Sequence, residues 1–358
     1  MTIQTKAIHW PAKPVYTTKH GRLYCADAHA ALRKQPLSRH RGKVQLVFTS
    51  PPFPLNRKKR YGNLEGPAYV DWLAEFAPLL VDYLTPDGSI VIELGNAWER
   101  GKPVMSTLTL EALLAFLKRA DLQLCQEFIC FNPARLPSPA EWVNVKRVRV
   151  KDAFTRVWWM SPSGNPKADN RRVLTGYSDS MKKLLRRGTY NAGRRPSQHH
   201  IGQTSFLTDN HGAIPPNVLV PAVEEMIADL CEVLPISNTT ASDSYQVYCR
   251  NHGIEAHPAR MPQRLVEFFV NFLTDPGDLV LDPFAGSNTT GLVADRLHRR
   301  WIAIEANQAY ARASAVRFSK KLSEQSGTHL EKGFHVSPEL ALRWDRPPAR
   351  PRDVRSHK

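Results

Sequence analysis

Short apolar segments alternate with amphipathic helical segments in two parts of this chain, and this alternation limits its fold more than any other feature. Runs of roughly four to eight apolar residues predict buried strands, and apolar residues at every third or fourth position predict helices. The predicted strands are 44–48, 89–94, 122–131, 279–282 and 301–305, and the predicted helices are 28–34, 71–83, 108–118, 264–273, 290–297 and 309–321. Such alternation is typical of βαβ units, so we predict an α/β fold with a parallel sheet.

The alternation stops between about residues 132 and 252, where Arg, Lys, Pro, Gly and Asn are frequent and only 157–160 and a helix-like 220–236 look regular. We predict an N-terminal extension, a first half of an α/β domain, an inserted basic module, the second half of the domain, and a disordered Pro- and Arg-rich tail. Their bounds are 1–15, 16–131, 132–252, 253–325 and 326–358. Within the first half, Pro86-Asp87-Gly88 is predicted to form a turn.

The basic residues are concentrated rather than spread along the chain. The formal net charge is +16, and residues 143–195 hold 14 basic side chains against three acidic ones. A second basic run is Arg57-Lys58-Lys59-Arg60. Clustered cations of this kind face a polyanion such as nucleic acid, or form a solvated surface that keeps a protein soluble. Charge alone does not decide between these two interpretations.

Several classes of protein are disfavoured by composition. No run approaches 18 apolar residues, so no membrane-spanning helix is predicted, and no apolar segment near the N-terminus suggests a secretory signal. The five cysteines are scattered and never spaced C-x-x-C, which argues against a zinc ribbon or a disulfide framework. We therefore expect a cytoplasmic protein without a metal site.

The segment Leu279–Glu305 has the layout of a site for a nucleoside cofactor. A predicted strand ends in Asp282, a loop of small residues opens a helix, and the next predicted strand ends in Glu305. Small residues let the backbone approach a ligand, and a later acid accepts hydrogen bonds from ribose hydroxyls. The loop matches neither G-x-G-x-x-G nor the phosphate-binding GxxxxGK[ST], which disfavours NAD and ATP. The alternative is a tight turn with a purely local purpose.

A second candidate site, Thr49-Ser50-Pro51-Pro52-Phe53, follows another predicted strand. Ligands of open α/β sheets bind at the carboxyl ends of strands. Two prolines stiffen this loop, Ser50 offers a hydroxyl, and Phe53 offers a ring face for stacking. Such a loop suits a planar base with an exocyclic amine, although a rigid turn is the simpler interpretation.

Ser50-Pro51-Pro52-Phe53, followed downstream by Asp282-Pro283-Phe284-Ala285-Gly286-Ser287, resembles the amino-methyltransferases of DNA modification. The order of these two motifs is similar to the circularly permuted N4-cytosine group, in which the catalytic motif precedes the cofactor motif. The resemblance runs from about residue 16 to 318 and includes TSPPFPLNRKKRYGN, FNPARLPSPAEWVN, VWWMS, YSDSMKKL, IPPN, AHPARMPQRLVEFF and GSNTTGLVA. It implies a Rossmann-like sheet that binds S-adenosylmethionine, interrupted by a basic DNA-recognition module.

The resemblance also implies roles for single residues. It makes 16–131 the catalytic half and 253–325 the cofactor half, with a catalytic set Ser50, Pro51, Pro52 and Phe53 and a cofactor set Asp282, Phe284, Ala285, Gly286, Ser287 and Glu305. Glu93 stands where the family has an acid, and it would contact the cofactor, relay the Ser50 proton or cap its strand. Asn288 departs from the glycine that is common in the wider family.

The activity implied is transfer of a methyl group to the N4 amine of a cytosine flipped out of a short duplex DNA site. Two alternatives stay open, an N6-adenine methyltransferase on the same scaffold and an inactive DNA-binding homologue. Ser50 favours cytosine, because the adenine group has Asp there. Methylation at carbon 5 would need a nucleophilic cysteine, which the family that performs it has after a proline, and none of the five cysteines follows a proline.

The same resemblance implies double-stranded DNA as partner. Arginines pair with base edges and phosphates, so the candidate DNA contacts are Arg57, Lys58, Lys59, Arg60, Arg171, Arg172, Arg194 and Arg195. We expect a monomer in a bacterial-type cytoplasm, associated with the nucleoid through its DNA. A cognate restriction endonuclease acting on the same site is compatible with the resemblance.

Overall fold

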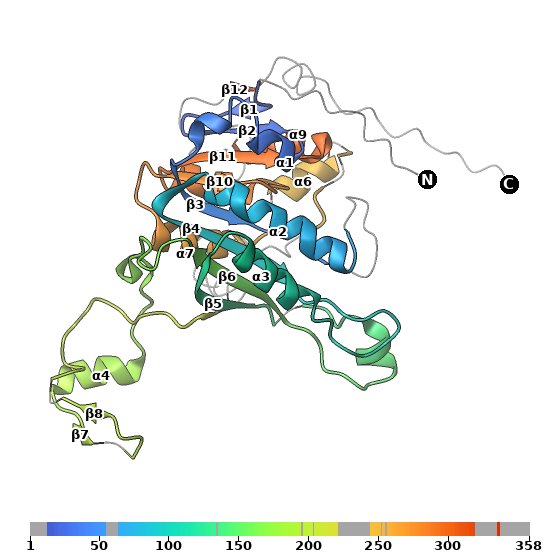
Figure 1. The fold of residues 1–358 in the computed structure, drawn as a ribbon. Coiled ribbons are helices and arrows are strands. Elements are labelled where there is room, and N and C mark those ends of the chain that lie inside the picture. Colours follow the sequence, from blue (N-terminus) through green and yellow to red (C-terminus); the bar gives the residue numbers. More distant parts are fainter. Residues whose placement is uncertain are drawn as a thin grey trace.

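The computed structural model describes residues 13–54, 64–133, 135–194, 196–202, 204–220, 244–251, 253–254, 256–318 and 335–336. In this part of the chain ten strands form one sheet in the order β12-β1-β2-β11-β10-β3-β4-β6-β5-β9 (Figure 1). Their bounds are β1 Tyr16–Thr17, β2 Gly21–Cys25, β3 Val44–Thr49, β4 Leu84–Gly95, β5 Gln123–Phe131, β6 Phe154–Ser161, β9 Val218–Leu219, β10 Leu279–Asp282, β11 Arg300–Glu305 and β12 His335–Val336.

The centre of the sheet is parallel, because β2, β11, β10, β3 and β4 all run in one direction. Strand β6 lies antiparallel between β4 and β5. The predicted α/β architecture with a mostly parallel sheet is therefore confirmed.

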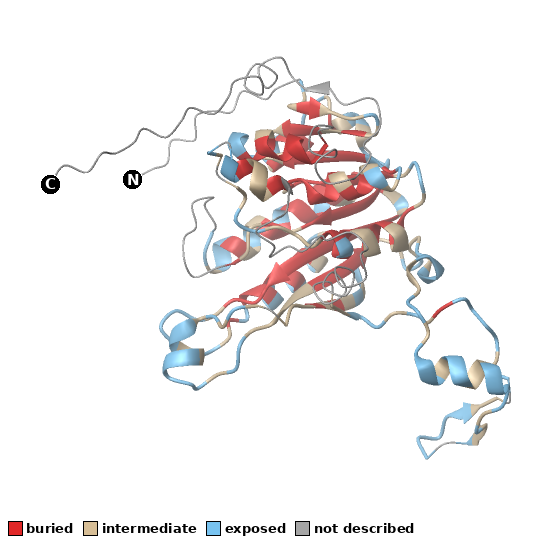
Figure 2. Cartoon of the chain, turned by 180° about the vertical axis from the view of Figure 1, so that it is seen from behind, coloured by how far each residue is buried: buried red, intermediate tan, exposed pale blue. Residues whose placement is uncertain are grey.

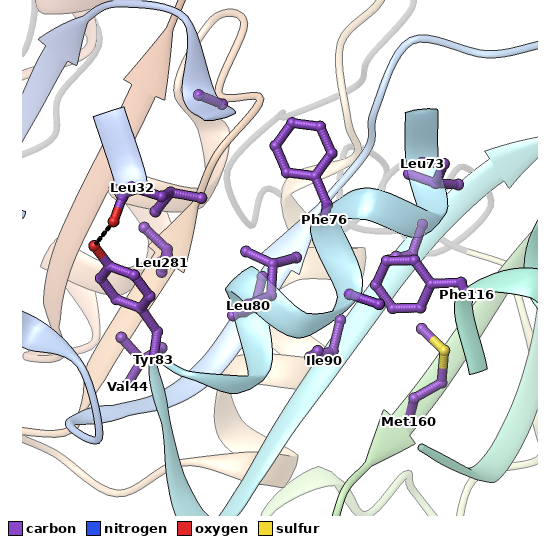
Figure 3. Close-up of a cluster of buried hydrophobic side chains, with 14 of the residues drawn as sticks. Leu32, Val44, Leu73, Phe76, Leu80, Tyr83, Ile90, Phe116, Met160 and Leu281 are labelled. Atoms are coloured by element: carbon purple, nitrogen blue, oxygen red, sulfur yellow. Dashed lines mark hydrogen bonds between the residues drawn. The ribbon is translucent and has the colours of Figure 1, made fainter. Parts of the chain in front are cut away.

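Helices cover both faces of the sheet. The helices are α1 Ala28–Leu32, α2 Pro67–Val81, α3 Leu108–Arg119, α4 Asp179–Arg187, α6 Ser244–Asn251, α7 Gln263–Leu273, α8 Thr289–Arg296 and α9 Gln308–Ser314. One buried cluster packs α1, α2 and α3 on the sheet, and a second packs α7, α8 and α9 on the other face (Figure 2). In the first cluster, the Tyr83 hydroxyl donates a 2.6 Å hydrogen bond to the Leu32 carbonyl (Figure 3).

The predicted strands and helices that fall on described residues were confirmed with shifted ends, and one predicted turn was wrong. Pro86-Asp87-Gly88 was expected to be a turn, but these residues lie inside β4, where the pairing with β3 shifts register between Val44 and Leu46. The bulge accommodates the proline and glycine without ending the strand. Helix α2 starts at Pro67, because a proline fits the first helical position, and the predicted helix 309–321 becomes α9 plus a short turn η4, Ala315–Phe318.

The predicted inserted module is divided in the structure. Strand β6 belongs to the main sheet, so the sheet resumes at Phe154 within residues 132–252. The remaining short elements are η1 Ser38–His40, η2 Glu141–Val145, η3 Asn170–Val173, and an outlying hairpin of β7 Gly193–Arg194 and β8 His200–Ile201. The segment 221–243, which contains most of the predicted helix 220–236, lies outside the described residues. Among the described helices none is long and apolar enough to cross a membrane.

The strand order places a switch in connection direction between β3 and β10. From β3 the chain continues through α2 to β4 on one side, and from β10 it continues through α8 to β11 on the other. In open α/β sheets the crevice outside the carboxyl ends of two such strands is the usual ligand site. Both candidate motifs lie there, because Ser50 follows β3 and Pro283 follows β10.

Candidate active site

The loop after β3 carries Ser50, and this hydroxyl is hydrogen-bonded to the carboxylate of Glu93 near the end of β4. Thr155, on the antiparallel strand β6, donates a 2.8 Å hydrogen bond to Glu93 Oε1. The structure therefore places Glu93 against the serine. Thr155 was not anticipated from the sequence, because its contact exists only through the pairing of β6 with β4.

Glu93 is buried, with 7% of its surface exposed. Burial disfavours the charged carboxylate and raises the pKa of Glu93 above its ordinary value of 4.5, and the hydrogen bonds from Thr155 and Ser50 offset part of that rise. A buried carboxylate with a raised pKa beside a hydroxyl is a suitable proton acceptor.

Asp282 joins the two motifs across the switch point. Its Oδ1 accepts from Thr49 Oγ1 at 2.7 Å and from the Phe284 amide at 3.0 Å, and its Oδ2 accepts from Thr290 Oγ1 at 2.7 Å. Burial raises the pKa of Asp282 to about 6, although these donors favour the charged form. One carboxylate thus fixes the end of β3, the loop after β10 and the first turn of α8.

The loop after β10 forms a cradle closed by Glu305 at the end of β11. Glu305 Oε2 accepts from the Gly286 amide and Oε1 from the Asn307 amide, each at 2.8 Å. Gly286 has φ +52°, and a Cβ there would lie 3.1 Å from the His257 ring. A carboxylate has about four acceptor positions, so Glu305 retains capacity for ligand hydroxyls.

Asn288 shows why this chain tolerates a departure from glycine. It adopts the left-handed region, φ +54°, where Asn is far better tolerated than most residues. Its Oδ1 accepts from the Gly291 amide at 3.0 Å as the cap of α8, and its Nδ2 donates to the Tyr16 hydroxyl at 2.8 Å. Asn288 therefore acts as a helix cap that anchors the loop to the first strand.

The other predicted cofactor residues come together in this loop. The Ala285 amide donates to the Ile304 carbonyl at 2.9 Å, and Arg317 Nε donates to the Ser287 carbonyl at 2.7 Å. The half-buried Phe284 ring packs against Trp72 and Phe76 of α2, with ring centroids 5.6 and 5.0 Å apart. The cofactor and catalytic sets therefore share one edge of the sheet, and Arg317 is a contributor that the sequence did not reveal.

Gly95, the last residue of β4, is a second site residue that the sequence did not predict. The Phe53 ring lies so close to it that a Cβ on Gly95 would be 2.6 Å from two ring carbons. Only glycine allows the ring this position, so Gly95 positions Phe53.

We expect Gly95→Ala to lower the rate of the expected methyl transfer about 10- to 100-fold, because ring displacement misaligns a base stacked on Phe53. Single-turnover rates on duplex DNA would measure this. Gly164→Ala is the matched control, since a Cβ there meets nothing closer than 3.6 Å and its rate should equal that of the wild type. An unchanged rate in Gly95→Ala would contradict the positioning role.

Three of the predicted DNA contacts, Arg171, Arg172 and Arg194, lie in the described part of the chain. Arg171 pairs with Asp169 at 2.8 Å, while Arg172 pairs with Asp275 at 2.6 Å and donates to the Thr274 carbonyl. These partners precede β10, at the edge of the sheet opposite Ser50. Arg194 is exposed in β7, and the remaining candidates lie outside the described residues: Arg57, Lys58, Lys59, Arg60 and Arg195. Their roles stay predictions.

In the described ranges no three His, Cys, Asp or Glu side chains come together that could hold a metal ion.

Comparisons with known proteins agree with this geometry. The DNA methylase family matches residues 44–316. The Type II methyltransferase M.PvuII of Proteus hauseri is 44% identical over 326 residues, which cover 90% of this chain and 91% of that protein. The Type II methyltransferase M2.DpnII of Streptococcus pneumoniae is 46% identical over 61 residues, 17% of this chain.

Among solved structures, the PvuII DNA methyltransferase, described as cytosine-N4-specific, matches with a TM-score of 0.66 and 38% identity. The match covers 89% of this chain and 95% of that one. The expected Rossmann-like methyltransferase fold is therefore confirmed. With a serine loop and a cofactor-type cradle tied together by Asp282, and with matches that span most of its length, this chain belongs to the DNA methylase family.

Proposed function

We propose that this protein transfers a methyl group from S-adenosylmethionine to the N4 amine of a cytosine flipped out of a short site in duplex DNA. The observation that carries this proposal is the Ser50 hydroxyl, hydrogen-bonded to the buried Glu93 and tied through Thr49 and Asp282 to the cofactor loop. The identity to M.PvuII and the likeness to a cytosine-N4-specific structure support the choice of base.

The cradle after β10 fits S-adenosylmethionine. Glu305 would hold the ribose hydroxyls, the Gly286 backbone, which carries no side chain, would let the ligand approach, and Phe284 would pack on the adenine. When bound, this cofactor supplies an electrophilic sulfonium methyl group.

Ser50 is oriented to hold the amine. Because its hydroxyl donates to Glu93, its oxygen lone pairs remain available to accept an N–H from the base. The Pro51 carbonyl is the second acceptor that we assign, and Phe53 stacks on the flipped ring. The prolines at 51 and 52 keep this loop rigid, so orientation contributes much of the acceleration.

The proton released on methylation leaves through the same pair. As the amine nitrogen bonds to the methyl carbon and the carbon–sulfur bond breaks, the nitrogen becomes positive. It returns to neutrality when its proton passes to the Ser50 oxygen and the Ser50 proton passes to Glu93. Burial raises the pKa of Glu93 and so gives it the basicity for this step, although the charge of Arg135 and the hydrogen bonds from Thr155 and Ser50 offset part of the rise.

Neither alternative is favoured. A solved structure that matches 89% of this chain at 38% identity is described as cytosine-N4-specific, which disfavours adenine. Ser50, Glu93, Gly286 and Glu305 are all present and hydrogen-bonded as a working site requires, which disfavours an inactive homologue. We further propose that the protein acts as a monomer and is the modification component of a restriction-modification system.

Transfer of label from methyl-labelled S-adenosylmethionine to genomic DNA tests this function. We expect label in duplex DNA and background levels in RNA of equal mass. Binding of S-adenosylmethionine without label in any DNA would identify the inactive homologue instead.

The pH dependence of the transfer tests the proton route. Glu93 must be ionised to accept a proton, so the single-turnover rate should fall as the pH falls through its raised pKa, with a midpoint above 4.5. Glu93→Gln should remove this acid limb and lower the plateau about 10- to 100-fold. Glu127→Gln on β5, where the native carboxylate accepts from Arg156, is the control and should keep the wild-type profile. An acid limb that survives in Glu93→Gln would exclude Glu93 from the proton route.

A further inference from the structure

The loop between β5 and β6 leaves the sheet beside the active site. Its base is closed by the Asn132 amide, which donates to the Ala153 carbonyl at 2.7 Å. Two residues further on, Thr155 donates to Glu93, which in turn accepts from Ser50. Figures 1 and 2 show this loop, green in Figure 1, projecting beyond the strand ends and away from the arm that carries α4. Residues 141–151 form its outer part, which we name the loop tip.

The loop tip exposes aliphatic side chains that proteins normally bury. Val145, Val148 and Val150 are 75%, 58% and 85% exposed. Valine is among the residues most often found fully buried, and neighbouring exposed apolar groups mark an interaction surface. Three exposed valines within six residues form a local apolar surface, which isolated exposed side chains such as Leu114 do not, and this surface is available to a partner.

Cations alternate with these valines, which identifies the partner. Lys146, Arg147, Arg149 and Lys151 lie in the same segment. Lys146 pairs with the exposed Glu141 at 2.9 Å, and Arg149 stacks over the Trp98 ring at 3.0 Å, so the four cations exceed the one carboxylate of the tip. An apolar protein surface covering the valines would also strip water from these cations. A nucleic acid takes both groups at once, because its phosphates neutralise the cations and its base stack accepts apolar side chains.

The loop tip is held in shape before any partner binds. The Lys146 amide donates to the Glu141 carbonyl at 2.8 Å, and the Val148 amide donates to the Trp142 carbonyl at 3.0 Å. The Lys151 ammonium donates to the Pro133 carbonyl at 2.6 Å. A loop tip that is already ordered loses little conformational entropy when it binds a partner.

We propose that Val145, Val148 and Val150 form an aliphatic wedge that enters the DNA base stack where the target cytosine has left it. The proposal rests on the function proposed above and assigns a step that Ser50 and Glu93 do not perform. Apolar side chains inserted between bases offset the cost of unstacking, and the lysines and arginines of the tip hold the adjacent phosphates. The wedge favours the extruded cytosine over the stacked one.

The test compares two duplexes carrying the sequence that the wild type methylates in genomic DNA. In one the target cytosine is paired with guanine, and in the other it faces an abasic site, so that extrusion breaks no base pair. The triple variant Val145→Ala, Val148→Ala, Val150→Ala should lower the single-turnover rate on the paired duplex about 10- to 100-fold. On the unpaired duplex its rate should return to within about threefold of the wild type, because extrusion no longer needs the wedge.

Leu114→Ala is the matched control, since this leucine is 65% exposed on α3 and should leave both rates unchanged. A second readout needs no catalysis: 2-aminopurine at the target position should brighten on binding to the wild type and less on binding to the triple variant. S-adenosylmethionine binding should be equal in both proteins.

Equal losses on the two duplexes, or no loss on either, would overturn the wedge while leaving methyl transfer by the wild type intact. A wild type that sediments as a dimer and a triple variant that sediments as a monomer would assign the valines to a second copy of this chain. Absence of methylcytosine from every DNA treated with wild type would refute the proposed function, and the wedge with it.

Discussion

Ser50→Ala should lower the rate of methyl transfer by about 10²- to 10⁴-fold, the range typical of a lost proton-transfer group. The substitution removes the oxygen that accepts the amine hydrogen. It also removes the proposed route by which a proton passes from that amine to Glu93. In the described part of the chain, it also leaves Thr155 as the remaining side-chain donor to Glu93. The proton of the methylated amine then has no assigned path to a base.

Cofactor binding should be unaffected in this variant. The cradle is held by Glu305, Gly286 and Asp282, and Asp282 reaches the catalytic strand through Thr49 rather than through Ser50. Single-turnover rates and calorimetric titration with S-adenosylmethionine measure the two effects separately. A Ser50→Ala enzyme that keeps most of its rate would remove serine from the reaction. A parallel loss of cofactor affinity would instead assign Ser50 a structural role.

Asp282→Ala is the second substitution with a large expected effect, and it acts on stability as well as on the cofactor. It leaves two buried hydroxyls and one amide without their acceptor, at Thr49, Thr290 and Phe284. Unsatisfied buried groups of this kind cost on the order of 3 kcal/mol of unfolding free energy. Affinity for S-adenosylmethionine should fall too, because the loop after β10 and the start of α8 lose their common anchor.

Urea unfolding with and without the cofactor measures both effects, and Asp282→Asn adds a pH test. The pKa of Asp282 is about 6 when folded and 3.8 ordinarily, so the folded protein binds this proton more tightly. The contribution of Asp282 is therefore fully present below pH 3.8 and is lost as the pH rises through 6, by about 3 kcal/mol. Asparagine does not titrate, so the wild type should lose stability relative to Asp282→Asn between pH 4 and 7. A constant difference across that range would contradict the raised pKa.

Much of the central sheet was predictable from local pattern. Strand β10 at Leu279–Asp282 matches its predicted bounds, and β3 and β11 differ from theirs by one residue, because buried parallel strands are continuous apolar runs with clear ends. Both site motifs were predictable for a related reason, since the carboxyl ends of parallel strands gather at one edge of the sheet.

Contacts that depend on strand order were not predictable. Thr155 reaches Glu93 only because β6 inserts antiparallel between β4 and β5, and Gly95 matters only because Phe53 lies over it. The basic composition of residues 132–252 predicted a single inserted module. Charge, however, does not show which part of such a segment forms a strand of the main sheet. In the structure, residues 154–161 form strand β6 of the main sheet. Arg172 pairs with Asp275 at the edge of the sheet opposite Ser50.

Nucleoside mass spectrometry of DNA treated with the wild type and methyl-labelled S-adenosylmethionine tests the central claim most directly. Digestion to nucleosides separates the methylated bases by mass and retention. We predict labelled N4-methylcytosine, formed about 10²- to 10⁴-fold more slowly when Ser50→Ala replaces the wild type. Labelled N6-methyladenine in its place would contradict the assignment of cytosine as the base that Ser50 holds.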